Sequence, residues 1–477
     1  MRILVVAANR AREPLPVMPY GACIAAEAAE RAGHEVRLLD LMFERRPLEA
    51  LGNQLRHFHP GLVAFSVRNI DNNDMAAPRL LCSELRRLVA TVRACPEVRT
   101  VIGGPAVGVM PRALLAFSGA EWAAVGDGER TFPALLAALE AGTSPHGVPG
   151  IGWLENGELR LVSREPEALP PRPEVPDFRR WIRLGAYRSR MAPVPLQTKR
   201  GCPHACVYCT YSVHEGREHR LYSADAVAEA VARLADDGCR DIELVDNVFN
   251  SPYGHAMEIC DALALSRSRA RLTTLEINPG FVDRPLLEAM EHAGFAGIGL
   301  TAESASERVL AGLGRNYGPA ELHAAAEAVG RSRLPCLWIF MLGGPGETET
   351  SAAATVAFAE RHVRPGDAAY FGAGVRIYPG TELERRALTE GVLDRPAEDA
   401  LEPIFYFSPE LSPGRARDLI AAATRRNPGF MNSAAFVHPL LPAATRVAAA
   451  LGLRPPLWRH TRTIRRIFGL IGRDIYD

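Results

Sequence analysis

Three cysteines lie within eight residues, Cys202, Cys206 and Cys209, with the spacing C-x3-C-x2-C. Thiolates this close together can all bind one inorganic core, which favours an iron–sulfur cluster. A fourth cysteine would give every iron of a [4Fe–4S] cluster a protein ligand, whereas three leave one iron free to bind a substrate. The spacing therefore predicts a [4Fe–4S] cluster with one open coordination position.

A zinc site is the alternative, because His214 and His219 follow the triplet at a spacing that zinc can use. It would leave Cys202 without a role, and no second C-x2-C pair occurs in the chain. The other six of the nine cysteines are scattered, which is typical of reduced thiols rather than of a disulfide framework. We therefore expect a cytoplasmic protein, and a reducing cytosol also suits an oxygen-sensitive cluster.

Lys199, three residues before the first cysteine of the triplet, is the only lysine among 55 basic residues. The accidental survival of one lysine in an arginine-rich background is one explanation. A specific role is the other, because a compact ammonium and a planar guanidinium are not interchangeable at a tight site. We predict a catalytic role for Lys199, in which case its replacement by arginine lowers activity.

The triplet, with the aromatic Tyr208 directly before its last cysteine, resembles the radical S-adenosylmethionine (SAM) superfamily. In that superfamily the amino and carboxylate groups of SAM bind the open iron. The resemblance implies that Tyr208 packs beside the cluster or SAM, and that the cluster cleaves SAM to a 5′-deoxyadenosyl radical. It also implies a reducing electron donor of the flavodoxin or ferredoxin type.

Strands and helices alternate around and after the triplet, in a segment that we place at residues 192–390. The pattern predicts six strands with helical crossovers, which is a partial (β/α)6 barrel with functional groups at the strand C-termini. The strands are expected at 195–200, 241–245, 273–277, 297–301, 336–341 and 369–378. The helices are expected at 223–236, 253–266, 284–292, 306–312, 319–332 and 349–361.

Polar residues and glycines follow these strands in the order that the superfamily resemblance implies. SAM is cationic and polyhydroxylated, so carboxylates and amides suit it, and glycines leave room for its flat base. An acidic residue past a strand end is also a common helix N-cap, so each position alone is a weak signal. The expected SAM-binding residues are Asp246, Asn247, Glu276, Asn278, Glu303, Ser304, Gly343, Gly344 and Arg376.

Residues 1–165 show the same alternation with short apolar strands, which predicts a doubly wound, Rossmann-like parallel sheet. The first loop lacks G-x-G-x-x-G, which argues against a nicotinamide or flavin site. The strands are expected at 2–8, 35–39, 62–66, 98–102 and 122–125, and the helices at 21–32, 49–58, 77–93, 111–118 and 131–139. Ligands of such sheets bind beyond the carboxyl ends of the strands.

The loops at those strand ends resemble the cobalamin-binding domain that precedes many radical SAM barrels. The residues that the resemblance marks as cobalamin-binding are Ser66, Arg68, Asn69, Asp71, Gly103, Gly104, Gly126 and Gly128. The first loop carries no D-x-H-x-x-G motif, so this motif supplies no histidine ligand for cobalt. The alternative is a flavodoxin-like domain that has lost its ligand or only positions the substrate.

Two other regions complete the domain plan. Residues 166–191 are expected to be a linker that begins with a proline-rich, semi-rigid stretch. Residues 391–477 are expected to be mostly helical, with helices at 411–423, 442–451 and 458–471 and no further strand–helix alternation. The last helix is amphipathic and basic, which fits weak contact with a membrane surface or, alternatively, a solvated arginine face.

The formal net charge is zero, which argues against binding to nucleic acid, and no run of about 20 apolar residues predicts a transmembrane segment. Together the patterns favour a cobalamin-dependent methyltransferase that acts on an unactivated carbon of a small-molecule or lipid-like substrate. A radical rearrangement, cyclisation or oxidation without methyl transfer is one alternative. A non-catalytic cobalamin or iron–sulfur sensor is the other, and a three-cysteine site with an open iron disfavours it.

Overall fold

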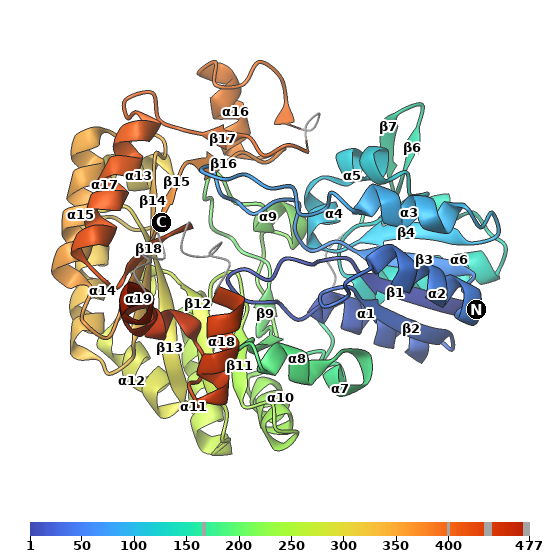
Figure 1. The fold of residues 1–477 in the computed structure, drawn as a ribbon, viewed down its shortest axis with the longest axis horizontal. Helices are drawn as coiled ribbons and strands as arrows, with labels where there is room; N and C mark the ends of the chain where they lie inside the picture. The colour runs from blue at the N-terminus through green and yellow to red at the C-terminus, as the bar shows by residue number, and fades with distance from the viewer. Residues whose placement is uncertain (165–167, 398–400, 434–440, 471–477) are drawn as a thin grey trace.

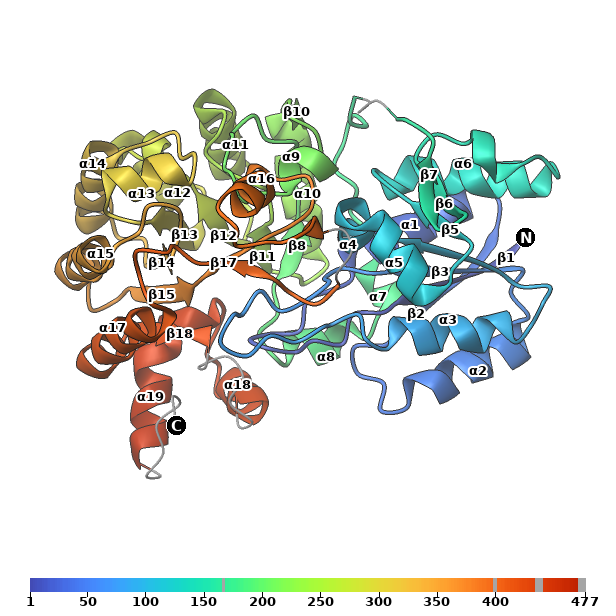
Figure 2. The same cartoon turned by 90° about the horizontal axis from the view of Figure 1, so that it is seen from above.

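The computed structural model describes residues 1–164, 168–397, 401–433 and 441–470. An N-terminal α/β domain lies beside a larger α/β domain (Figure 1). Of the C-terminal helices, α17 (Pro413–Arg426) and α19 (Thr461–Leu470) lie by the far edge of the larger sheet, whereas α18 (Leu441–Ala450) lies toward the N-terminal domain (Figure 1). Both domains have a seven-stranded sheet. The view from above shows helices on both faces of the N-terminal sheet (Figure 2).

The N-terminal sheet has the strand order β2-β1-β3-β4-β5-β6-β7, with β1 to β5 parallel. This confirms the doubly wound, Rossmann-like prediction. The apolar strands are nearly inaccessible, as their position between two helical layers requires. The strands are β1 (Arg2–Ala7), β2 (Glu35–Asp40), β3 (Leu62–Ser66), β4 (Arg99–Gly103), β5 (Trp122–Ala124), β6 (Ile151–Glu155) and β7 (Glu158–Leu161).

Three of the five predicted helices of this domain agree with the structure to within two residues, and two differ. They are α1 (Tyr20–Arg31), α2 (Pro47–Phe58), α3 (Leu85–Arg93), α4 (Pro105–Val109), α5 (Pro111–Ser118) and α6 (Gly128–Glu140). The helix predicted from residue 77 begins only at Leu85, because Asp71 and Leu80 form a β-bridge and Asn72 bonds the backbone of Ala77 and Arg79. Helix α4 and the antiparallel β6–β7 hairpin were not predicted, and α6 begins three residues early.

The larger sheet is parallel, with the order β18-β15-β14-β13-β12-β11-β8. All six predicted barrel strands are present and curve into a partial barrel covered by helices on its outer face (Figure 1). The strands are β8 (Val194–Leu196), β11 (Asp241–Leu244), β12 (Arg271–Ile277), β13 (Phe295–Glu303), β14 (Cys336–Leu342), β15 (Ala368–Ala373) and β18 (Phe430–Asn432). The crossover helices are α10 (Ala224–Asp236), α11 (Tyr253–Ser266), α12 (Arg284–His292), α13 (Glu307–Gly312), α14 (Pro319–Arg331), α15 (Glu349–His362) and α17 (Pro413–Arg426).

Three predictions about the barrel were wrong in detail. The first strand does not run continuously to Arg200: it ends at Leu196, and β9 (Lys199–Arg200) pairs antiparallel with β10 (Arg220–Leu221). The sixth strand ends at Ala373, because Gly374 takes a left-handed φ of 77° before β16 (Val375–Arg376). Strand–helix alternation also continues beyond residue 391, since β18 pairs in parallel with β15.

The remaining segments connect and cap the domains. Short helices α7 (Phe178–Trp181) and α8 (Leu184–Arg188) lie in the expected linker, and α9 (Tyr211–His214) lies between the two sheets (Figure 1). The others are β17 (Phe405–Tyr406), α16 (Glu382–Thr389), α18 (Leu441–Ala450), a 3-10 turn at Leu457–His460 and α19 (Thr461–Leu470). No helix in the described ranges is both long and apolar enough to cross a bilayer.

The basic C-terminal helix covers one side of the barrel sheet. Trp458 and Ile464 pack with Leu337 and Met431. The Arg465 guanidinium donates to the Thr424 and Asn427 carbonyls at the C-terminal end of α17. This packing favours the alternative of a capping helix over membrane contact. The predicted end of this helix at residue 471 lies outside the described residues.

Candidate active site

The cysteine loop leaves β9 and crosses the open end of the barrel. The Cys202 amide donates to the Gly216 carbonyl, and the Val207 amide donates to Leu313 beyond α13. Gly201 has a φ of 82°, and a Cβ there would come within 2.0 Å of the Glu218 carbonyl oxygen. The three thiols of the triplet form no disulfide, and these backbone hydrogen bonds help to fix the loop.

The two histidines of the zinc alternative have other partners. The ring of His219 bonds the Gly201 carbonyl at 3.1 Å and the Ser251 hydroxyl at 3.3 Å, and His214 packs against Gly108 of the N-terminal domain. Within the described ranges, no three His, Cys, Asp or Glu side chains converge on the position of a single metal ion. Three sulfur donors on one short loop are a suitable ligand set for an iron–sulfur cluster.

Arg315 organises the space beside the triplet, and the sequence analysis did not identify it. Its guanidinium lies 3.2 Å from the Cys206 Sγ and 3.2 Å from the Tyr208 hydroxyl, and also donates to Thr301. The Tyr208 hydroxyl in turn donates to Glu303 at 2.6 Å. Burial would lower the pKa of Arg315, but the neighbouring Tyr208, Tyr317 and Glu303 raise it, so the guanidinium stays cationic beside the Cys206 sulfur.

Glu303, one of the predicted SAM-binding residues, has an unusual backbone. Its φ is 58°, and the register with β14 shifts between Thr301 and Glu303. A left-handed conformation is costly for a side-chain-bearing residue, and such positions gather at functional sites. The shift leaves Ala302 as an extra residue, so that Glu303 rather than Ala302 pairs with Phe340. The Glu303 carboxylate there contacts both Tyr208 and Arg315.

Two more carboxylates enter the barrel from neighbouring strands. Burial, with a smaller contribution from the nearby Glu303, raises the pKa of Glu276 to about 8. Burial also raises the pKa of Glu243 to about 7. Neither carboxylate has a hydrogen-bond partner among the described residues. Glu276 was expected from the sequence, whereas Glu243 was missed because it lies two residues inside β11 rather than after its end. A cationic ligand in the barrel would stabilise both groups in their ionised form.

Replacement of Glu243 by glutamine is expected to stabilise the ligand-free protein at alkaline pH. The ordinary pKa of glutamate is 4.5, and burial raises the pKa of Glu243 to about 7 in the folded chain. Between these two pH values the folded chain keeps the proton on Glu243, whereas the unfolded chain loses it. The group therefore makes the folded state progressively less stable as pH rises through that window. Thermal unfolding at about pH 5 and about pH 8 should show a gain for Glu243→Gln only at the higher pH. An equal gain for the exposed control Glu97→Gln would contradict the assignment.

Lys199 and Asp246 form a buried ion pair behind the cysteine loop. The Lys199 ammonium lies 3.3 Å from the Asp246 carboxylate and donates to the Phe249 carbonyl at 2.8 Å. Asp246 also accepts from the amide and hydroxyl of Thr198. Lys199 is only 2% exposed, and both of these contacts are internal to the protein.

The other residues predicted to bind SAM lie at the ends of the barrel strands, and most of them bond to other residues of the protein. Asn247 donates to Glu215. Asn278 caps the turn after β12 and donates to Asn316. The Ser304 hydroxyl pairs with Thr355 in the core.

The two glycines after β14 have close neighbours of their own. A Cβ at Gly343 would come within 2.5 Å of the Phe407 ring, and one at Gly344 would meet Leu313 at 3.1 Å. Packing is therefore one reason for the absence of side chains at these two positions.

A cavity of about 600 Å³ lies between the two domains, and all eight residues predicted to bind cobalamin line it. Its N-terminal wall follows the carboxyl ends of the strands and the small residues of α1. Gln197, Arg200, Tyr211, His214 and Asn247 line it from the barrel side. The switch point of the N-terminal sheet, between β1 and β3, therefore opens toward the cysteine loop, as expected for a doubly wound fold.

The cavity fits a large, flat cofactor. Gly21 and Gly128 line it, and a Cβ on either would meet nothing within 4 Å, so backbone borders open space there. The described lining includes one histidine, His214, whose Nδ1 is buried without a hydrogen-bond partner. Arg68 reaches the cavity from the end of β3, and burial lowers its pKa. Apolar walls, glycine edges and a few polar side chains suit cobalamin.

A methyl group at Gly108 is expected to disturb this cavity. Its Cβ would come within 2.0 Å of His214 Nδ1, so Gly108→Ala should push the imidazole from the wall. Overpacking of this kind costs about 1–3 kcal/mol. If the displaced imidazole transfers that cost to the cofactor's space, cobalamin should bind about 5- to 150-fold more weakly in a visible-absorption titration. Gly330→Ala, on a helix with open space around the position, should bind as the parent does. Unchanged affinity in Gly108→Ala would contradict the placement of His214.

Asp127 joins the two domains on the opposite side of the cavity. It bonds Arg164 at 2.9 Å and, across the interface, Arg200 at 2.9 Å and Arg220 at 2.8 Å. Burial would raise the pKa of Asp127, but the hydrogen bonds from Arg220 and Arg164 and the charge of Arg200 hold it well below the ordinary range. Arg200 and Arg220 face each other across β9 and β10, so this hairpin, which begins at Lys199, is fixed to the N-terminal domain.

A second interdomain ion pair joins two residues that were each predicted to bind a cofactor. The Arg376 Nε donates to the Asp71 carboxylate at 2.9 Å, and both side chains are buried. Their mutual contact gives them an architectural role whether or not a ligand is present. The Tyr378 hydroxyl donates to Asn73 beside this pair.

In a comparison with known proteins, models of two protein families match segments within the two domains. A model described as the radical SAM superfamily matches residues 196–359, and a model described as the B12-binding domain matches residues 7–136. A methyltransferase of Pyrococcus horikoshii is 26% identical over 76% of this chain and 77% of its own length. The cytidylyl-2-hydroxyethylphosphonate methyltransferase of Streptomyces wedmorensis is 24% identical over 83% and 82% of the two chains.

A solved structure shares the whole arrangement. The radical SAM methyltransferase TsrM of Kitasatospora setae, bound to tryptophan and a SAM analogue, superposes with a TM-score of 0.85 over 99% of this chain and 100% of that one. The two sequences are 21% identical. The similarity shows that both proteins have the same fold, including the order of the two domains.

Proposed function

We propose, from the membership of this chain in the radical SAM superfamily with a B12-binding domain before its barrel, that it is a cobalamin-dependent methyltransferase. The observation that carries the proposal is the shared cavity of about 600 Å³. Residues from the N-terminal strand ends and residues next to the cysteine loop line one space. A methyl group held by the first domain can therefore meet a substrate held by the second without passing through solvent.

The three cofactors supply the chemistry when they are bound: the cluster binds and activates SAM, and cobalamin carries the methyl group. Cys202, Cys206 and Cys209 would hold the cluster. Arg315 keeps a positive charge beside the Cys206 sulfur and orients Tyr208 and Glu303 at the same edge. The carboxylates at Glu276 and Glu243 favour a cationic group, which fits the sulfonium and ammonium of SAM or an amine on the substrate.

The remaining predicted residues are proposed in two roles. Ser66, Arg68, Asn69, Gly103, Gly104, Gly126 and Gly128 form the cobalamin wall, while Lys199, Asp246, Asp71 and Arg376 position the elements around it. We also propose the domain limits 1–165, 166–191, 192–390 and 391–477, a flavodoxin- or ferredoxin-type electron donor, and the cytoplasm as the site of action. The proposed substrate is a small molecule or a lipid-like molecule.

Methyl transfer is tested with SAM that carries a deuterated methyl group. The full chain is prepared anaerobically with iron, sulfide and cobalamin, and its visible spectrum reports both cofactors. Tryptophan and a cytidylylated phosphonate are the first substrates to test, because the named relatives carry these molecules in their descriptions. Appearance of the labelled methyl group in a product supports the proposal.

The same assay separates the alternatives. Formation of 5′-deoxyadenosine without transfer of the label would favour radical rearrangement, cyclisation or oxidation. With both cofactors bound, the absence of SAM turnover across the tested substrates would favour a sensor. The methyl-transfer proposal fails in either case.

A further inference from the structure

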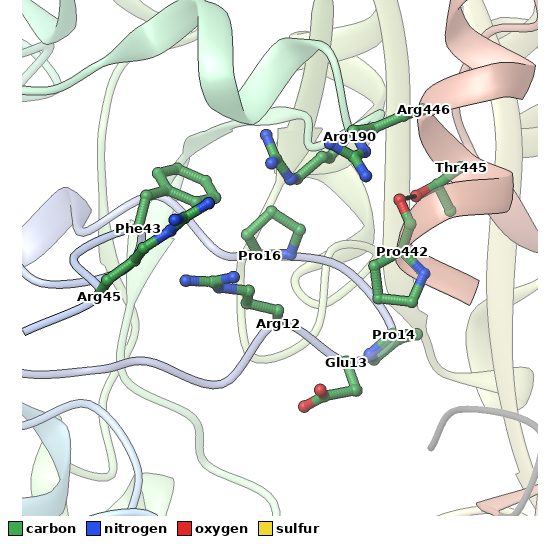
Figure 3. A pocket seen from close by; sticks show the side chains of 10 residues that line it. All are labelled: Arg12, Glu13, Pro14, Pro16, Phe43, Arg45, Arg190, Pro442, Thr445 and Arg446. Carbon is green, nitrogen blue, oxygen red and sulfur yellow. Dashed lines mark hydrogen bonds between the residues drawn. The ribbon is translucent and has the colours of Figure 1, made fainter. Parts of the chain in front are cut away.

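A second, separate pocket lies where the C-terminal helix α18 meets the N-terminal domain. Its volume is about 430 Å³, and it is bordered by the loop after β1, the segment after β2, the end of α8, and α18. Figure 3 shows four guanidinium groups, those of Arg12, Arg45, Arg190 and Arg446, gathered around Phe43 and Pro16. The sequence analysis assigned no role to any of these arginines.

The positive charges of this pocket are not balanced by acids. Glu13 is the one acidic residue of the described lining, and Figure 3 shows its carboxylate turned away from the guanidinium groups. That carboxylate instead lies 3.6 Å from Arg79. The pocket therefore has four arginines and one glutamate, which is already paired with an arginine outside the pocket. This is a local excess of positive charge in a chain whose formal net charge is zero.

The arginines that have protein partners bond only neutral groups. Arg12 donates to the Met42 carbonyl and Arg190 to the Ala186 carbonyl, and both stack over the Phe43 ring at 5.4 and 4.7 Å. Within the described chain, Arg45 and Arg446 have no hydrogen bond or ion pair from their side chains. The pKa of Arg190 is lowered, mainly by burial and to a smaller extent by the charges of Arg446 and Arg12. An anion in the pocket would remove this repulsion.

The geometry points to a binding site for the phosphate groups of a small molecule, either a phosphate ester or a diphosphate. Guanidinium groups bind phosphate oxygens through paired hydrogen bonds, and arginine is preferred where planar, bidentate recognition of an anion matters. Several guanidinium groups around one concavity can bind more than one anionic oxygen at once. A pocket of about 430 Å³ has room for a diphosphate.

The pocket shares its walls with the cofactor cavity, which gives the ligand a route to influence catalysis. In the loop after β1, Arg12 lines the pocket and Met18 lines the cavity. In the segment after β2, Phe43 lines the pocket and Met42 lines the cavity. The phosphate group can therefore belong to the substrate itself or to a separate effector. The binding proposal does not depend on methyl transfer.

Binding is tested by calorimetric titration of the full chain with pyrophosphate, in the absence of SAM. We expect saturable binding that weakens as salt increases. The double variant Arg45→Gln/Arg446→Gln should bind at least about tenfold more weakly for each arginine removed. Arg417→Gln, an exposed arginine of α17 outside the pocket, is the matched control and should bind as the parent does.

Two results would overturn the site: no saturable binding of pyrophosphate, or equal affinity in the double variant. Binding to anionic phospholipid vesicles without binding to pyrophosphate would also overturn it, and would indicate a membrane surface instead. Once a substrate is known, the source of the phosphate follows from kinetics. Pyrophosphate that competes with the substrate places the phosphate on the substrate, and pyrophosphate that changes the rate without competition identifies an effector.

Discussion

Replacement of Cys206 by serine is expected to abolish methyl transfer while leaving the fold intact. A serine hydroxyl is a poor ligand for iron, and a cubane cannot be held by the two remaining thiolates of this loop. The loop itself should persist, because its backbone bonds to Gly216 and Leu313 fix it. The unfolding free energy of the cluster-free protein should change by no more than about 1 kcal/mol.

The measurement compares iron content, visible absorption and label transfer between the parent and Cys206→Ser. Cys95→Ser is the matched control, since Cys95 is a half-buried free thiol outside the loop. It should keep the iron, the absorption and the activity of the parent. A Cys206→Ser protein that retains the full iron content would show that Cys206 is not a cluster ligand.

Replacement of Lys199 by methionine is expected to lower the unfolding free energy by about 3–5 kcal/mol, the cost of leaving one member of a buried ion pair alone. Asp246 would then be fully buried without its ammonium partner. The amide and hydroxyl of Thr198 still donate to it, which places the expected loss toward the lower end. Cluster binding should weaken as well, because the pair lies directly before the cysteine loop.

A double-mutant cycle separates this positioning role from a catalytic one. Lys199→Met/Asp246→Asn removes both charges and should recover part of the lost stability. If stability and cluster content recover together with activity, Lys199 acts by positioning. If Lys199→Met unfolds within 1 kcal/mol of the parent, the buried pair does not stabilise the barrel, and a catalytic role becomes the better explanation.

Much of the fold follows from local patterns in the sequence. The apolar strands between amphipathic helices predict both sheets, because strand periodicity and helix caps such as Ser223 are local signals. The errors occur where distant residues decide the structure. Thr198 bonds Asp246 at the break between β8 and β9, and no pattern within residues 195–200 encodes that contact.

The site was predictable as a set of positions but not as a set of contacts. The cysteine spacing indicates the cluster directly, and the resemblance of the strand-end loops to a cobalamin-binding domain indicates cobalamin. Arg315 carried no such signal, because it acts through a contact with Cys206 across 109 residues of chain. Asp71 and Arg376 were each expected to face a ligand, and the structure pairs them with each other. A polar residue at a strand end can serve the ligand or the neighbouring domain, and only tertiary structure distinguishes the two.

The interdomain ion pairs have a consequence for how the chain is made. A ribosome releases the N-terminal domain first, so the carboxylates of Asp127 and Asp71 emerge before their cross-domain partners. Arg200 follows Asp127 by 73 residues, and Arg376 follows Asp71 by 305. During that interval the Asp71 carboxylate stands without its arginine, whereas Asp127 already pairs with Arg164 of its own domain. The later arginines then join the two domains by completing both ion pairs.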